Sequence, residues 1–190
     1  MIFSKLALPA TFALVASALP QGTQSSTSTS SASPSSTSGA SSSGGGVTIT
    51  NNLNSTVYLW STSSSSSSGS GGQSLSSGGS YTESWQKTSD GGVSIKMSTT
   101  EGDESSVLQF EYTNDGDTLY WDLSSINLDA DSAFVTAGFS ATPDGGGSGS
   151  SCEALTCSAG DSDCTASYQN PDDEDTHSCD SSVQMALTLG

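Results

Sequence analysis

Four cysteines near the C-terminal end are the residues of this chain most capable of chemistry. They are Cys152, Cys157, Cys164 and Cys179, and no cysteine precedes them. Such crowding is typical of a small region of an exported protein that disulfides hold in place of a hydrophobic core. Four cysteines allow three disulfide connectivities, and the spacing leaves all three open.

The densest run of charge is Asp172, Asp173, Glu174 and Asp175, directly after Pro171. Hard cations such as Ca²⁺ bind carboxylate oxygens, which makes this run a candidate cation site. It lacks the DxDxDG loop with a terminal Glu that a calcium-binding loop uses. We therefore predict a solvated loop whose Asp side chains accept hydrogen bonds from turn amides, with no bound metal and no cofactor.

His177 is the only histidine in the sequence. Zinc and copper sites need several nitrogen or sulfur ligands, and oxidised cysteines cannot supply the sulfur. Hydrolysis by a Ser-His-Asp triad would need a serine placed beside His177, and serine is too abundant here to indicate one. We interpret His177 as a loop residue.

Aromatic residues at predicted strand positions allow two interpretations. They are Trp60, Trp85, Trp121, Tyr58, Tyr81 and Tyr120. Aromatic side chains in strands mostly pack between sheets, but an exposed group of them can stack on sugar rings. Because neighbouring strand residues point to opposite faces, Tyr120 and Trp121 cannot both face the core.

The charge balance excludes two classes of partner. Twenty acidic residues stand against three lysines and no arginine, and the formal net charge is −17. Nucleic acids and anionic membranes favour basic proteins, so we expect neither as a partner. We interpret the acidity as a source of solubility in an extracellular medium, and we expect a monomer.

Residues 1–18 have the pattern of a secretory signal peptide. Lys5 precedes the apolar stretch Leu6–Val15, and Ala16-Ser17-Ala18 provides a cleavage site. The apolar stretch is too short to span a bilayer comfortably. We predict cleavage after Ala18 and a secreted protein, either extracellular or held in a cell wall.

Residues 19–46 form a predicted stalk. From Gln21 to Gly46 the chain is almost entirely Ser, Thr, Gly, Ala and Pro, a composition typical of a disordered, O-glycosylated segment. Two similar stretches follow, a predicted loop insertion at Ser61–Ser80 and a predicted linker at Gly145–Ser151. Asn54 begins the tripeptide Asn-Ser-Thr, so we predict N-glycosylation there.

Residues 47–190 are predicted to form an all-β domain. Short apolar runs alternate with polar residues at period two, which is typical of strands with one buried face. Eight strands are predicted, at 47–51, 56–60, 81–85, 93–98, 108–112, 118–123, 134–139 and 183–189, and no helix. The segment Asn114–Asp117 has the composition of a hairpin turn. These features favour an antiparallel sandwich or barrel.

Four segments together resemble the thaumatin-like superfamily, and most closely the Blastomyces yeast-phase-specific protein family of antigenic thaumatin-like proteins. They are VTITNNLNSTVYLW (47–60), residues 91–127, FVTAGFSATP (134–143) and the cysteine-containing tail. The resemblance implies a thaumatin-like antiparallel β-sandwich with a small disulfide-held C-terminal loop region.

The tail carries the most specific part of the resemblance. Two closely spaced cysteines are followed by CTASY (164–168) and then by DDEDTHSC (172–179). The resemblance implies the nested disulfides Cys152–Cys179 and Cys157–Cys164. The family usually has a further disulfide between the segment after the first strand and the C-terminal end, where this chain has Leu53 and Gly190.

The resemblance also implies a position for an acidic cleft. Plant thaumatin-like proteins build this cleft from an Arg, a Glu and several Asp. The matching Glu position holds Gln109, one Asp position is kept as Asp122, the next holds Asn127, and the chain has no Arg. Glu111 lies two residues from Gln109 on the same strand face, so it could replace the missing Glu.

We therefore take Glu111, Asp122, Asp172 and Asp173 as the candidate binding residues of this cleft, and we name no catalytic residue. Glycoside hydrolysis needs two carboxyl groups at a set separation, and two of the cleft positions hold amides. The sequence favours a non-enzymatic extracellular or wall-associated protein that binds polysaccharide such as β-glucan. The alternatives are an effector or inhibitor that binds a host or competitor protein, and a weak β-glucan hydrolase.

Overall fold

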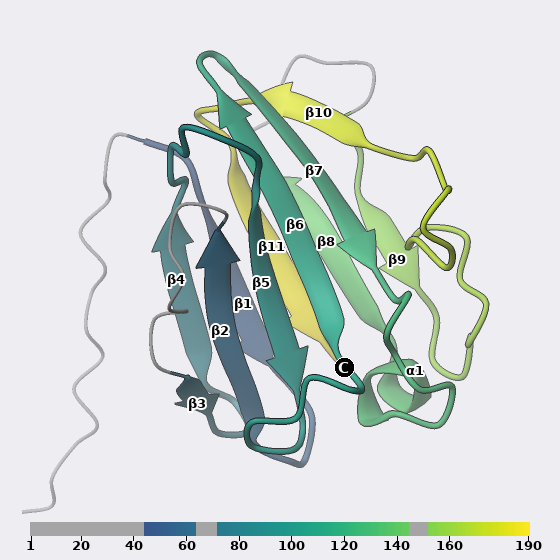
Figure 1. Cartoon of the computed structure of the whole chain (residues 1–190). Coiled ribbons are helices and arrows are strands. Elements are labelled where there is room, and N and C mark those ends of the chain that lie inside the picture. The colour runs from purple at the N-terminus through teal and green to yellow at the C-terminus, as the bar shows by residue number, and fades with distance from the viewer. Residues whose placement is uncertain (1–43, 64–71, 145–151) are drawn as a thin grey trace, which may run out of the picture. The chain divides into compact units, whose positions relative to one another are not determined.

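The computed structural model describes residues 44–63, 72–144 and 152–190, which form two β-sheets packed face to face (Figure 1). The predicted signal peptide (1–18) and the predicted linker (145–151) lie outside the described residues. So does the predicted stalk (19–46), apart from its last three residues.

The first sheet has five strands in the order β4-β1-β11-β8-β9. These are β4 (Ser80–Ser84), β1 (Gly46–Asn51), β11 (Gln184–Leu189), β8 (Phe139–Asp144) and β9 (Leu155–Cys157). β1 and β11 run parallel, and the other neighbours run antiparallel. The parallel pair joins segments that are far apart in the sequence, and it lies at the centre of this sheet.

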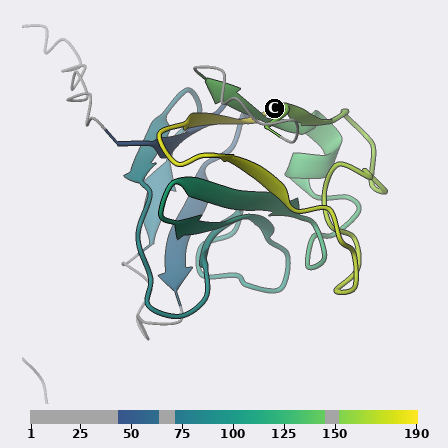
Figure 2. The same ribbon diagram turned by 90° about the horizontal axis from the view of Figure 1, so that it is seen from above.

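The second sheet has six strands in the order β10-β7-β6-β5-β2-β3, all antiparallel. These are β10 (His177–Asp180), β7 (Thr118–Ser124), β6 (Leu108–Asp115), β5 (Val93–Ser98), β2 (Val57–Ser63) and β3 (Gln73–Leu75). In Figure 1 this sheet lies in front of the first one, and Figure 2 shows the same two layers from above. The all-β sandwich predicted from the sequence is confirmed.

The predicted strand at 134–139 is wrong, as is the expectation that the chain has no helix. The short helix α1 covers Ala133–Ala137, and β8 begins only at Phe139. The Val135 amide donates to Ser132 Oγ at 3.2 Å, which caps the start of the helix. Gly138, at φ 83°, ends the helix in a conformation that favours glycine. These two caps outweigh the weak alternation of the sequence.

The sequence pattern did not predict three short strands, namely β3, β9 and β10. They have three or four residues each, with the sequences QSL, LTC and HSCD, so they carry too few apolar positions to show a period. The predicted loop insertion at Ser61–Ser80 is wrong in its described part, because β2 continues to Ser63 and β3 follows at Gln73.

The core forms where the inner faces of both sheets meet. Its largest fully buried side chains include Trp121, Phe110 and Phe134. The rings of Phe110 and Trp121 stack with their centroids 5.9 Å apart. Trp121 is 0% exposed while its neighbour Tyr120 is 44% exposed, so the two point to opposite faces as the alternation predicts.

Two disulfides hold the segment between β9 and β10, residues 158–176, which we call the lobe. Cys152 bonds to Cys179 in β10, and Cys157 at the end of β9 bonds to Cys164. The pairing is therefore the nested one. Leu53 and Gly190 also lie side by side, since a Cβ atom added to Gly190 would lie 3.0 Å from Leu53 Cδ2. At this place, where the family usually has a disulfide, the two residues lie close together without a covalent bond.

The two disulfides should stabilise the domain unequally. They close loops with sequence separations of 27 and 7 residues. Chain entropy gives about 3.5 kcal/mol for the longer loop and about 2.4 kcal/mol for the shorter one. We expect the double variant C152S/C179S to lose more free energy of unfolding than C157S/C164S, by about 1 kcal/mol in urea titrations. An equal loss, or a larger one for C157S/C164S, would contradict this assignment.

Candidate functional site

The β6–β7 hairpin places two carboxyl groups next to each other on the outer face of the six-stranded sheet. Glu111 of β6 pairs in register with Asp122 of β7. Directly opposed side chains in an antiparallel pair have Cβ atoms about 5 Å apart. The hairpin closes through a two-residue turn between Asp115 and Thr118, and Gly116 there has φ 65°, which favours glycine.

The two carboxyl groups lie in an open hollow of about 300 Å³, which we call the acidic hollow. Its lining residues are Gly92, Val93, Glu111, Tyr112, Thr113, Tyr120, Asp122 and Thr176. They come from β5, β6, β7, the segment before β5 and the end of the lobe. Tyr120 is the one large hydrophobic side chain in the described ranges that is classed as exposed.

Asp122 is the most strongly perturbed acid of the hollow. Its Oδ1 atom is buried and accepts no hydrogen bond from any described residue. Burial, together with the negative charge of Glu111, raises the pKa of Asp122 from 3.8 to about 7. The Glu111–Asp122 pair therefore keeps a proton to a higher pH than two ordinary carboxyl groups would.

The position that matches the cleft Glu of plant thaumatin-like proteins contributes no acid. Gln109 is 8% exposed, and its Nε2 donates to Ser124 Oγ at 3.4 Å. Ser94 Oγ donates to Gln109 Oε1, also at 3.4 Å. Gln109 thus links β5, β6 and β7 by side-chain hydrogen bonds. The acid on the same face of β6 is Glu111, two residues further along the strand.

The lobe contributes Thr176 to the acidic hollow, and Tyr168 anchors the lobe in this position. The Tyr168 amide donates to the Leu123 carbonyl at 2.8 Å, and the Ser125 amide donates to the Tyr168 carbonyl at 2.8 Å. These bonds attach the lobe to the end of β7. The Tyr168 hydroxyl then bonds to Thr176 Oγ1 at 2.8 Å, which holds Thr176 beside the carboxyl pair.

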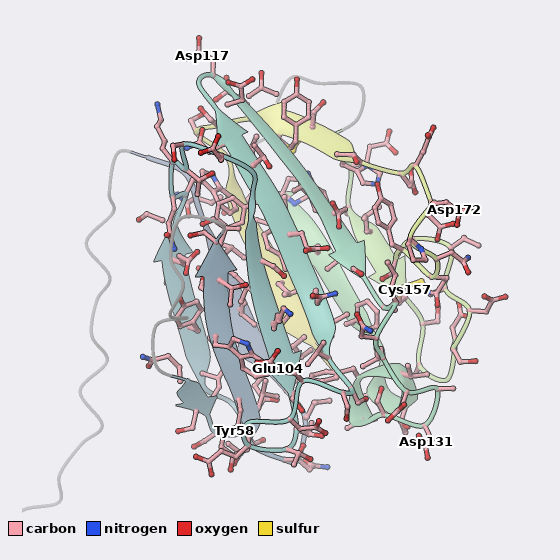
Figure 3. All side chains as sticks on the ribbon, in the orientation of Figure 1. Tyr58, Glu104, Asp117, Asp131, Cys157 and Asp172 are labelled. Atoms are coloured by element: carbon pink, nitrogen blue, oxygen red, sulfur yellow. A yellow bond between two sulfur atoms is a disulfide. The ribbon has the colours of Figure 1, made fainter. Side chains whose placement is uncertain are left out.

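Asp172 and Asp173 do not line the acidic hollow, which corrects their grouping with Glu111 and Asp122 in one cleft. Asp173 Oδ2 accepts the Gln169 and Asn170 amides at 2.7 and 2.8 Å, and these backbone bonds lower its pKa. Asp173 therefore closes a turn within the lobe, as the sequence predicts for this run. Asp172 is exposed, and Figure 3 shows it on the lobe, far from Asp117 at the tip of the β6–β7 hairpin.

The remaining candidates for metal ligation lie apart. Within residues 44–63, 72–144 and 152–190, no three or more His, Cys, Asp or Glu side chains come close enough to hold a metal ion. His177 is the first residue of β10, so its interpretation as a loop residue is wrong. Its ring lies 5.2 Å from the ring of Trp121, and its Nε2 lies 3.8 Å from Asp175 Oδ1.

Glu83 is the centre of a polar cluster that was not predicted from the sequence. It accepts hydrogen bonds from the hydroxyl groups of Tyr112 at 2.6 Å, Tyr81 at 2.7 Å and Ser61 at 3.3 Å. Burial, and then the bond to Glu83, raises the pKa of both tyrosines. The alternation of β4, in which Tyr81 and Trp85 pack on the core, was the signal that places Glu83 on the inner face.

The fold is that of a thaumatin-like protein. The family model of the Blastomyces yeast-phase-specific protein matches residues 34–190, and the chain belongs to that family. It is 49% identical over 118 residues to the secreted thaumatin-like protein calA of Emericella nidulans, covering 62% of this chain and 66% of that protein. It is 35% identical over 118 residues to the antigenic thaumatin-like protein of Arthroderma benhamiae, covering 61% and 56%.

Two solved structures share the fold. The crystal structure of the protein elicitor MoHrip2 from Magnaporthe oryzae matches with a TM-score of 0.61 and 24% identity, covering 76% of this chain and 98% of that one. The structure of the thaumatin-like xylanase inhibitor TLXI matches with a TM-score of 0.50 and 15% identity, covering 75% and 97%.

These relatives confirm the predicted family and its secreted character. The alignments span 66% and 56% of the lengths of the two sequence relatives. Within the described parts of the chain, no helix is long and apolar enough to cross a membrane. Asn54 is exposed between β1 and β2, and its glycosylation stays a prediction.

The raised pKa of Asp122 should make the stability of the domain depend on pH. An acid whose folded-state pKa is raised from 3.8 to about 7 contributes fully below pH 4, and its contribution is lost as the pH rises through 7. We expect D122N to match the wild type at pH 4 and to exceed its free energy of unfolding by roughly 1 to 3 kcal/mol at pH 8.5, after solvent screening.

Urea titrations at both pH values measure this difference. D144N serves as the control for the loss of one negative charge, because Asp144 is exposed at the end of β8 in the other sheet. A gain for D122N that is equal at pH 4 and pH 8.5 would contradict the assigned titration.

Mutation should distinguish Asp173, which closes a turn, from its exposed neighbour Asp172. We expect D173A to lower the melting temperature at pH 7, because the amides of Gln169 and Asn170 lose their acceptor. The exposed D172A is the matched control and should change the melting temperature little. Since the pKa of Asp173 is lowered, the effect of D173A should shrink as the pH falls through that value. Calorimetry showing equal effects of the two variants would contradict this role.

Proposed function

We propose that this secreted thaumatin-like protein is a non-enzymatic, wall-associated or extracellular protein that binds an uncharged polysaccharide, β-glucan, in the acidic hollow. The observation that carries the proposal is the placement of the exposed Tyr120 beside the Glu111–Asp122 pair in one hollow. An aromatic face next to convergent polar groups is the usual composition of a sugar site.

Each part of the hollow has a role in this proposal. The ring of Tyr120 offers an apolar face for a sugar ring. The carboxyl groups of Glu111 and Asp122 offer acceptor oxygens to sugar hydroxyls, apart from Asp122 Oδ1, which is buried. The hydroxyls of Thr113 and Thr176 can donate or accept at the rim.

Gly92 supports the shape of the hollow. A Cβ atom there would lie 2.7 Å from the Tyr112 carbonyl oxygen and 2.8 Å from Thr113 Oγ1. The chain before β5 therefore approaches β6 more closely than any larger residue permits.

The carboxyl pair also favours a second candidate function, weak glycoside hydrolysis, since a protonated acid beside a second carboxyl group is what that chemistry requires. Two features support binding over hydrolysis. Asp122 Oδ1 is buried, and the family's cleft positions hold Gln109 and Asn127 with no Arg in the sequence. Release of reducing ends from β-glucan that disappears in E111Q would establish the hydrolase instead.

A protein partner is the third alternative. The two solved structures that share the fold are titled as a protein elicitor and a xylanase inhibitor. This alternative predicts a specific extracellular partner and no retention on polysaccharide, so one pull-down experiment separates it from the proposal.

Retention on insoluble β-glucan at low salt tests the proposal, with chitin as the comparison surface. We expect Y120A to weaken binding about five- to tenfold, because the stacking face is lost. Y58A is the matched control, since Tyr58 lies at the far side of the same sheet, on β2, and does not line the hollow (Figure 3). No retention of the wild type, or equal weakening by Y58A, would overturn the site.

A further inference from the structure

We propose that the acidic hollow takes up one proton together with its uncharged glycan, so that binding is tight in acid and weakens as the solution becomes alkaline. This inference rests on the proposed function and adds its regulation. The geometry that supports it is the direct register of Glu111 with Asp122 inside one hollow.

The first step concerns the hydrogen-bonding capacity of the pair. Two ionised carboxylates have only acceptor atoms, whereas a pair with one proton offers a donor as well. Sugar hydroxyls both donate and accept, so the singly protonated pair complements them better. Asp122 Oδ1 is buried and receives no hydrogen bond from any described residue, so a proton held there replaces no existing hydrogen bond.

The second step concerns charge. A bound glycan displaces water from the hollow, and the repulsion between two adjacent negative charges increases when water no longer screens them. The free pair already resists full ionisation, since burial and the charge of Glu111 raise the pKa of Asp122 to about 7. Covering the pair raises this value further, and binding above neutrality therefore requires proton uptake.

The groups around the pair offer little compensation for a second negative charge. On β5, Ser94 lies opposite Glu111, and Lys96 lies two pairs further along, opposite Gln109. The segment before β5 contributes Asp90, two residues before Gly92, and the lobe contributes Asp175 next to Thr176. His177 follows Thr176, and its ring packs on the core residue Trp121. Lys96 is therefore the single cation near the hollow among these neighbours.

Calorimetric titration of the full chain with soluble β-glucan oligosaccharides at several pH values tests the inference. If the singly protonated form alone binds, the Kd of the wild type rises about tenfold between pH 6 and pH 8. Titrations in buffers of different ionisation enthalpy should show uptake approaching one proton per glycan at pH 8.

Two variants sharpen the test. D122N keeps the shape of the side chain and supplies a permanent donor, so we expect a Kd that stays the same from pH 6 to pH 8, whatever its absolute value. D144N, on the other sheet, should follow the wild type at every pH.

The outcomes separate the two claims. A wild type that binds with the same Kd at pH 6 and pH 8, or without proton uptake, overturns the proton linkage and leaves the proposed function intact. A wild type that binds no β-glucan at either pH refutes the proposed function as well. A D122N variant with the pH dependence of the wild type overturns the assignment of the proton to this pair.

Discussion

The register between β6 and β7 is the constraint on which the rest of this structure depends. In this register Phe110 pairs with Leu123 and Tyr112 with Trp121 on the core side, while Glu111 pairs with Asp122 on the outer side. Because strand side chains alternate, a slip of β7 by one residue would bury Asp122 and expose Trp121, the largest ring of the core. Burial of the aromatic face thus forces two carboxyl groups of an acidic protein into contact.

The lobe turns this contact into a partly enclosed site. The Cys157–Cys164 disulfide attaches it to β9, the Cys152–Cys179 disulfide closes the chain around it, and the backbone bonds of Tyr168 attach it to the end of β7. Thr176 then closes one side of the acidic hollow, and the surrounding residues withdraw Asp122 from water. Other acids lie on different parts of the molecule, as Figure 3 shows for Asp117 on the hairpin tip, Asp131 near α1 and Asp172 on the lobe. The hollow differs from these places because its two acids share one strand pair.

Much of the sandwich was predictable because apolar alternation is strong in its long central strands. β5, β6, β7 and β11 were predicted nearly in full, and their inner faces form much of the core. The short strands and α1 were not predictable from period alone. A three-residue strand has no measurable period, and α1 depends on the caps at Ser132 and Gly138.

The candidate site was predictable in part. Alternation and the family resemblance place Glu111 and Asp122 on one face, but their pairing requires the strand register, which depends on the turn at Gly116. Asp172 and Asp173 were predicted to belong to the same cleft, because a dense run of acidic residues in a sequence does not show where the side chains lie in space. Only the fold shows that Asp173 is engaged by the amides of its own turn. The inward position of Glu83 was visible in the alternation of β4, although an acid on a core face needs the hydroxyls of Tyr81 and Tyr112, which only the fold supplies.

The measurement that tests the central claim most directly is the titration of the Asp122 side-chain carboxyl carbon by NMR on ¹³C-labelled protein without ligand. The structure predicts that this carbon titrates near pH 7. Titration of Asp122 near its ordinary value of 3.8 would show that the pair is fully ionised at neutral pH. The account of the acidic hollow as a site that holds a proton would then be contradicted.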